Sequence, residues 1–126
     1  MKKLNDYLRK VNANIIKQKG IIDEEKIPEV LQEFYSNIKS VELEYGNIWN
    51  YNKALEISKA EPFYPNWFVF GKDNYFNFWL CSKINYENNC YFTYWDHESG
   101  LEIEEPIWKD LLSFLQAMEK EYNGEW

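Results

Sequence analysis

The chain has 126 residues, of which 45% are apolar and 19% aromatic, and its net charge is −7. This length and apolar content predict one domain with one hydrophobic core and exclude a disordered chain. No apolar run reaches the roughly 18 residues of a membrane span, and residues 1–6 lead into no apolar signal segment, so we expect a cytoplasmic protein.

The charge is distributed unevenly along the chain. Residues 1–20 contain six basic side chains against Asp6, a net of +5, whereas the remaining residues carry a net of −12. An acidic body repels a phosphate backbone, and contacts to bases and phosphates mostly use arginine, of which the chain has only Arg9. We therefore expect no binding to nucleic acid.

The first predicted elements are two helices. Apolar residues recur at helical spacing over residues 3–18 and Gly20 follows as a stop signal, which predicts an amphipathic helix. Pro28 opens a second helix over residues 28–37, because a proline in the first turn gives up no hydrogen bond.

From residue 40 the hydrophobic period changes from 3.6 to 2. Residues 41–45 alternate apolar side chains with glutamates, and Gly46-Asn47 is a turn signal before residues 48–51, so we expect a hairpin. Residues 52–60 favour a short helix with Asn52 as its cap.

Strands are predicted again in the second half of the chain, over residues 67–70, 75–81, 90–95 and 101–104. Alternation gives the second of these two faces, made of Phe76, Phe78 and Leu80 and of Tyr75, Asn77, Trp79 and Cys81. Pro106 opens a last helix with an apolar stripe that docks on the core. The order of elements predicts an α+β fold, with a largely antiparallel sheet of about four to six strands packed against N-terminal and C-terminal helices.

The residue types that carry catalysis are sparse. Cys81 and Cys90 are expected to be free buried thiols. The neighbours of His97, Asp96 and Glu98, would point to the opposite face of a strand, which suits neither a catalytic triad nor a three-ligand metal site. A nucleophile and base pair of Cys81 and His97 lacks a third orienting group. We therefore expect no enzyme and no metal site.

Acidic residues are concentrated towards the C-terminus, where residues 96–126 carry a net of −7. A solvated face and a docking surface for a basic partner both account for this run, and both interpretations stay open. Aromatic side chains on the strand over 75–81 would act as anchors, with burial in the core as the alternative. The predicted partner-binding residues are Tyr75, Trp79, Glu87, Asp96, Glu98, Glu102, Glu104 and Glu105.

Three motifs follow one another between residues 27 and 118. They are Ile27-Pro28 with Leu31 and Phe34-Tyr35, then Phe68-Val69-Phe70-Gly71 with Asp73, then Trp108 with Leu111, Leu112, Phe114 and Leu115. In this order they resemble the entry helix, the strand ending in glycine and an acidic turn, and the closing helix of the SUKH superfamily. Its members include bacterial immunity proteins against polymorphic toxins and domains of fungal cell-wall regulators.

The resemblance implies a single SUKH-like domain over residues 1–126, without catalytic residues or cofactor, that binds and neutralises a toxin domain made by the same genome. We therefore expect a bacterial immunity protein, a monomer or weak dimer that binds no nucleic acid and no membrane. Its partner would be a cognate toxin protein, often a nuclease, with a basic active-site cleft. Two alternatives stay open: a pocket on the aromatic sheet face for a small ligand, and a scaffold module.

Overall fold

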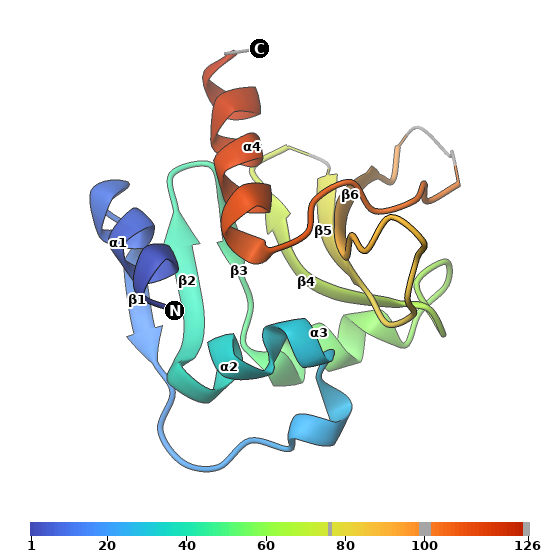
Figure 1. The fold of residues 1–126 in the computed structure, drawn as a ribbon, viewed down its shortest axis with the longest axis horizontal. Helices are drawn as coiled ribbons and strands as arrows, with labels where there is room; N and C mark the ends of the chain where they lie inside the picture. Colours follow the sequence, from blue (N-terminus) through green and yellow to red (C-terminus); the bar gives the residue numbers. More distant parts are fainter. Residues whose placement is uncertain (76, 99–101, 125–126) are drawn as a thin grey trace.

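The computed structural model describes residues 1–75, 77–98 and 102–124, which form an α+β fold with one antiparallel sheet (Figure 1). The helices are α1 (Lys2–Lys10), α2 (Glu29–Asn37), α3 (Tyr51–Ser58) and α4 (Leu111–Asn123), with a short 3-10 helix, η1 (Glu24–Lys26). The strands are β1 (Asn14–Lys17), β2 (Ile38–Leu43), β3 (Gly46–Ile48), β4 (Trp67–Asp73), β5 (Asn77–Ser82) and β6 (Phe92–Asp96). Each strand pairs with the next along the chain, so the order in the sheet is the order in the sequence.

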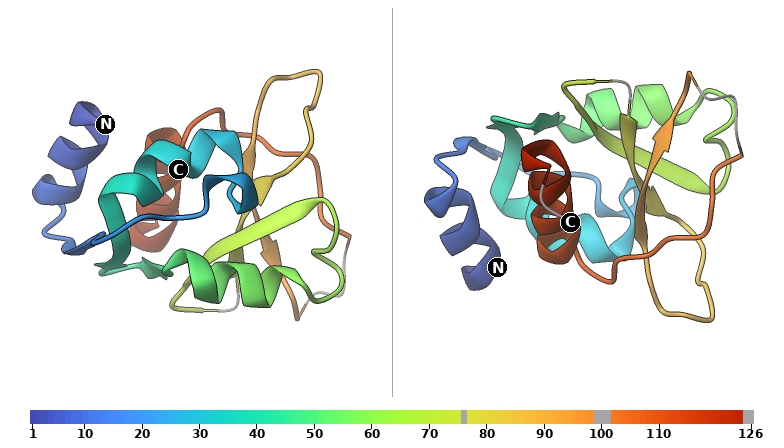
Figure 2. Two further views of the ribbon diagram at one scale, coloured as in Figure 1. Left: turned by 90° about the horizontal axis from the view of Figure 1, so that it is seen from below. Right: turned by 90° about the horizontal axis from the view of Figure 1, so that it is seen from above.

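Apolar side chains cover both faces of the sheet. The larger cluster joins one face to α1, α2 and α4, and the smaller cluster lies on the other face. Figure 2 shows α3 and α4 on opposite sides of β4. As the alternation predicts, Trp79 and Cys81 belong to the larger cluster and Phe78 and Leu80 to the smaller one. Phe76 lies outside the described residues.

The first helix is shorter than predicted. The expected helix over 3–18 ends at Lys10, and residues 14–17 form the edge strand β1 instead. Asn12 adopts a left-handed conformation with φ 57°, which reverses the chain and ends the helical hydrogen-bond pattern. Ile15 and Ile16 then pair with β2, where β-branched side chains fit better than in a helix.

The hairpin and the helix that follows it are confirmed, with small shifts in position. The turn between β2 and β3 lies at residues 44–45, and the predicted turn at 46–47 is the start of β3. The cap of α3 is Asn50 rather than Asn52, because the Asn50 side chain accepts a hydrogen bond of 3.0 Å from the Lys53 N–H.

The predicted strand at 101–104 is absent from its described part, residues 102–104. This stretch is irregular, and the described residues that follow it, 105–110, make one bridge to the sheet, between Trp108 and Phe92. Residue 101 lies outside the described residues.

The last helix begins later than predicted. It starts after Asp110 instead of at Pro106, because the Asp110 side chain accepts a hydrogen bond of 2.7 Å from the Ser113 N–H and so caps the first turn. It ends at Asn123, and the left-handed conformation of Gly124 (φ 71°) caps the helix. Within the described part of the chain, no helix is both long enough and apolar enough to cross a membrane.

Candidate functional site

Two hollows lie where the C-terminal half of α4 meets the ends of β4, β5 and β6. Their volumes are about 340 and 470 Å³, and they share Asn77 and Glu121. We refer to the two together as the acidic groove. Its acidic side chains are Asp73, Asp96, Glu102, Glu104 and Glu121, and its aromatic ones are Tyr45, Tyr75, Tyr94, Trp95 and Tyr122. Among the described residues no lysine or arginine lines it.

The turn between β4 and β5 is held by Asp73. Its Oδ1 accepts hydrogen bonds from the backbone N–H groups of Tyr75 (2.9 Å) and Asn77 (3.1 Å), and its Oδ2 accepts one of 2.7 Å from Asn77 Nδ2. The carboxylate therefore has a fixed place in the groove. The same bonds keep Tyr75 at the rim, where 58% of it is exposed.

Glu121 and Tyr94 meet in the middle of the groove. The Tyr94 hydroxyl donates a hydrogen bond of 3.4 Å to Glu121 Oε1. Burial raises the pKa of the Glu121 carboxyl, the charge of Asp73 raises it further, and the bond from Tyr94 opposes both. Burial also raises the pKa of Tyr94, with smaller contributions from Glu121 and Glu104. The groove is therefore a place where added negative charge is costly and a positive group is favoured.

The predicted partner-binding residues separate into three groups. Those that line the groove are Tyr75, Asp96, Glu102 and Glu104. Those that are exposed but line neither of its hollows are Glu87, Glu98 and Glu105. The third group is Trp79 alone, which is fully buried.

The expected role of Trp79 as a surface anchor is wrong. Its ring lies against Gly46 and Gly71, so close that a Cβ on Gly46 would come within 2.6 Å of it. On the other side it packs edge-on against Phe114, with ring centroids 5.7 Å apart. An indole enclosed in this way between two glycines and a helix is a core residue.

Sequence reasoning missed Asp73, Tyr94 and Glu121 as residues of the groove. Glu121 lies three residues after Met118, so it continues the apolar stripe of α4. A carboxylate on such a stripe was the available signal. Asp73 was singled out only as the acidic turn of a motif, and Tyr94 gave no signal. Only the pairing of β4, β5 and β6 brings these two residues to one end of the sheet.

The sheet separates Cys81 from His97. Cys81 belongs to the larger cluster, whereas the His97 ring packs against Phe78 and Trp95 of the smaller cluster. Burial raises the pKa of the Cys81 thiol, which disfavours the thiolate that a nucleophile needs. Both cysteines are free and buried, as predicted. In the described ranges, no cluster of three or more His, Cys, Asp or Glu side chains is suited to hold a metal ion.

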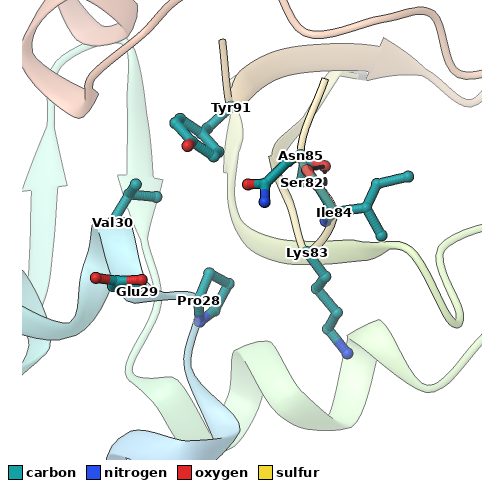
Figure 3. A pocket seen from close by; sticks show the side chains of 8 residues that line it. All are labelled: Pro28, Glu29, Val30, Ser82, Lys83, Ile84, Asn85 and Tyr91. Atoms are coloured by element: carbon teal, nitrogen blue, oxygen red, sulfur yellow. Dashed lines mark hydrogen bonds between the residues drawn. The ribbon is translucent and has the colours of Figure 1, made fainter. Parts of the chain in front are cut away.

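Another hollow, of about 530 Å³, lies between the start of α2 and the loop after β5 (Figure 3). Figure 3 shows Pro28 and Val30 on one side of it and Tyr91 and Asn85 on the other. Its charged lining residues are one glutamate and one lysine, and none of the predicted binding residues lines it. The acidic groove is the better candidate, because four predicted residues and three groups with raised pKa, Tyr45, Tyr94 and Glu121, meet there.

Comparisons of the chain with protein-family models, with curated proteins and with solved structures find no match. The groove must therefore be interpreted from its own chemistry.

Proposed function

We propose that this chain is a toxin-neutralising binding protein whose acidic groove docks onto a basic surface of its partner. The observation that carries the proposal is the composition of the groove, in which five carboxylates and five aromatic rings gather at one end of the fold. Opposite potentials speed association, and aromatic side chains with exposed area are frequent anchors of interfaces. The resemblance of three sequence motifs to the SUKH superfamily supports a toxin as the class of partner.

The mechanism is steric and electrostatic. A nuclease holds the phosphates of its substrate with basic side chains. Carboxylates placed over those side chains compete for the same charge, and the rim around Tyr75 keeps the substrate out. Glu121 contributes most when ionised, and a cation beside it lowers its raised pKa, so binding releases protons at weakly acidic pH.

The alternative of a small-ligand pocket on the aromatic sheet face has less support. Phe70, Trp79 and Leu80 are fully buried on the two faces of the sheet. A ligand there would have to displace side chains that already fill the space, at the cost of the packing that stabilises the fold.

The proposal is tested by capture followed by rescue of growth. The tagged chain is used to isolate its partner from the cells that make it, and the partner's separate domains are expressed with and without this chain. We expect one domain to arrest growth when expressed alone and to be harmless when this chain is present. A variant with Glu102→Gln and Glu104→Gln should protect poorly.

The matched control carries Glu87→Gln and Glu105→Gln, which remove the same charge outside the groove. It should protect as well as the parent chain. Growth arrest that the parent chain does not relieve would contradict the proposed function. Equal protection by the two variants would contradict the role of the groove.

A further inference from the structure

On the outer edge of β6, the backbone groups of Tyr94 make no hydrogen bond to another strand in the described part of the chain. On its inner side, the Ser82 N–H donates to the Tyr91 carbonyl at 2.7 Å. On its outer side, Phe92 and Trp108 exchange N–H to carbonyl hydrogen bonds of 3.0 and 3.1 Å. Because successive residues of an antiparallel strand alternate between the two sides, the backbone groups of Tyr94 point outward, as those of Phe92 do.

The bridge between Phe92 and Trp108 cannot continue to Tyr94. In antiparallel register the next partner is Pro106, which has no N–H to donate. The carbonyl of Pro106 already accepts a hydrogen bond of 2.9 Å from Asn88 Nδ2. In the described part of the chain, the Tyr94 N–H and carbonyl therefore have no backbone partner on this side.

The larger hollow of the acidic groove opens at this edge. Thr93, Tyr94 and Asp96 of β6 line it on one side, and residues of the 102–107 segment line it on the other. Its charged lining residues are Asp96, Glu102, Glu104 and Glu121, with no lysine or arginine among the described residues. The hollow therefore offers a strand edge and a negative potential together, and these select an occupant that is extended and basic.

We propose that the hollow receives an extended segment of the partner, bearing lysine or arginine at alternate positions, which pairs with Tyr94 as a further strand of the sheet. This inference rests on the proposed function, because it specifies how the same groove holds its partner. Main-chain hydrogen bonds to Tyr94 fix the segment in register. Its side chains alternate in direction, so residues two apart reach the same wall of carboxylates.

A second copy of this chain is the rival occupant. Its β1 is the other edge strand of the sheet, and Lys17 lies at the end of that strand. Figure 1 shows β1 and β6 at opposite ends of the sheet, so copies paired in this way would form an open chain. Self-association is therefore an outcome that the experiment must distinguish.

The test is amide hydrogen exchange of the full-length chain, labelled with ¹⁵N, in the presence of a capped heptapeptide of alternating threonine and arginine. With the peptide at ten times its Kd, we expect exchange at the Tyr94 amide to slow by about tenfold. The amides of Thr93 and Trp95 should keep their rates, because they already face β5. This alternation is the signature of an added strand.

Three controls separate strand pairing from simple attraction of charge. The same peptide with glutamate in place of arginine should not bind. A peptide with an N-methyl group on its central residue should lose protection at Tyr94 if that residue pairs there, whereas methylation of the next residue should be tolerated. In the protein, Glu104→Gln should weaken peptide binding and Glu87→Gln should leave it unchanged.

The outcomes for this inference are distinct from those for the proposed function. Peptide binding that depends on Glu104 but leaves the Tyr94 amide unprotected overturns strand addition, and the rescue of growth still tests the function. Failure of the peptide to bind at millimolar concentration also overturns the inference. Protection of Tyr94 that rises with protein concentration, without peptide, assigns the edge to a second copy. If the peptide protects the Tyr94 amide but the chain rescues growth from no captured domain, strand addition is supported and the proposed toxin-neutralising function is contradicted.

Discussion

Trp79 lies in the core because two glycines leave room for its ring. Gly71 pairs directly with Trp79, and a Cβ at Gly71 would meet the Asn47 backbone carbonyl and come within 2.9 Å of the ring. The backbone oxygen cannot move away without disturbing the pairing of β3 and β4. We expect Gly71→Ala to lower the free energy of unfolding by about 3 kcal/mol, measured by urea denaturation.

The control for this change is Gly124→Ala. Gly124 has a left-handed conformation, but no atom of the described residues beyond its neighbours lies within 4 Å of the position of its Cβ. The substitution should therefore cost only the backbone strain, about 1 kcal/mol. If Gly71→Ala costs no more than Gly124→Ala, the close packing of the indole on the sheet is not a determinant of stability.

The ionised form of Glu121 favours binding of a basic partner, but it destabilises the folded chain. Burial raises its pKa in the folded chain, so the folded state holds this proton more tightly than the unfolded state does. The stability that this proton adds to the folded chain is fully present below pH 4.5, the ordinary pKa of a glutamate. It is lost as the pH rises through the raised pKa of Glu121 in the folded chain. We expect Glu121→Gln to raise the melting temperature at pH 7 and to leave it unchanged at pH 3.

The comparison for Glu121→Gln is Glu87→Gln, which removes a charge from an exposed loop. Its melting temperature should follow that of the parent chain at both pH values. A gain for Glu121→Gln that is as large at pH 3 as at pH 7 would mean that the charge of Glu121 is not its cause.

At the scale of elements, one hydroxyl connects α1, the β2–β3 turn and α4. The hydroxyl of Tyr7 shares a hydrogen bond of 2.6 Å with that of Tyr45 and donates at 3.2 Å to Glu119 on α4. Both tyrosines are buried, with 8% and 3% of their surface exposed. We expect Tyr7→Phe to reduce the free energy of unfolding by about 1–2 kcal/mol, because it leaves the Tyr45 hydroxyl without this partner.

A double-mutant cycle with Tyr45→Phe measures the coupling of the two hydroxyls. The double variant should lose less than the sum of the single variants, because no hydroxyl is then left unpaired. Tyr64→Phe is the control, since Tyr64 is 63% exposed and its change should have little effect. Additive losses at Tyr7 and Tyr45 would show that the two hydroxyls act independently.

The sequence predicts the larger part of the fold, since every helix expected before residue 60 and every strand expected between residues 41 and 95 has a counterpart. The errors have local physical causes. The apolar side chains of residues 14–17 continue the helical spacing. However, the left-handed conformation of Asn12 ends the helix before them, and they form the edge strand β1. Pro106 has the properties of a helix start, yet the cap at Asp110 decides where α4 begins.

The candidate site was only half predictable. Charge along the chain indicated Asp96, Glu102 and Glu104, because they lie close together in sequence. Asp73 and Glu121 come from distant segments, and only the register of the sheet and the position of α4 bring them into the same groove. Trp79 failed as a prediction because alternation assigns a face to a strand residue but does not say whether that face is covered.

At the scale of the molecule, charge is separated along the sheet. Figure 1 shows α1 beside β1 at one end of the sheet. Lys2, Lys3 and Lys10 are exposed on this helix, whereas the acidic groove borders β6, the strand at the other end. A partner with a basic surface is therefore attracted to one end and repelled by the other. This polarity orients the partner before contact.

Reversal of charge at the acidic end should act on the rate of encounter. We expect a variant with Glu102→Lys and Glu104→Lys, both in the groove, to associate with the captured partner about tenfold more slowly at low ionic strength. The difference should shrink as salt screens the charges, and stopped-flow fluorescence measures both effects.

The matched control reverses Glu24 and Glu25, which are exposed on η1 and do not line the acidic groove. It has the same net charge as the test variant. If both variants associate equally slowly, net charge alone is responsible and the position of the groove does not matter.

The order of the strands also determines when the groove comes into existence. Each strand pairs with the one before it, so during synthesis the sheet grows from β1 towards β6 by the addition of neighbouring segments. The groove needs Tyr45 from the β2–β3 turn and Asp73 from β4, but also Glu104 and Glu121, which follow all six strands in the sequence. A chain still attached to the ribosome therefore has most of its sheet before it has its groove, and the capacity to hold a partner arises only when α4 is complete.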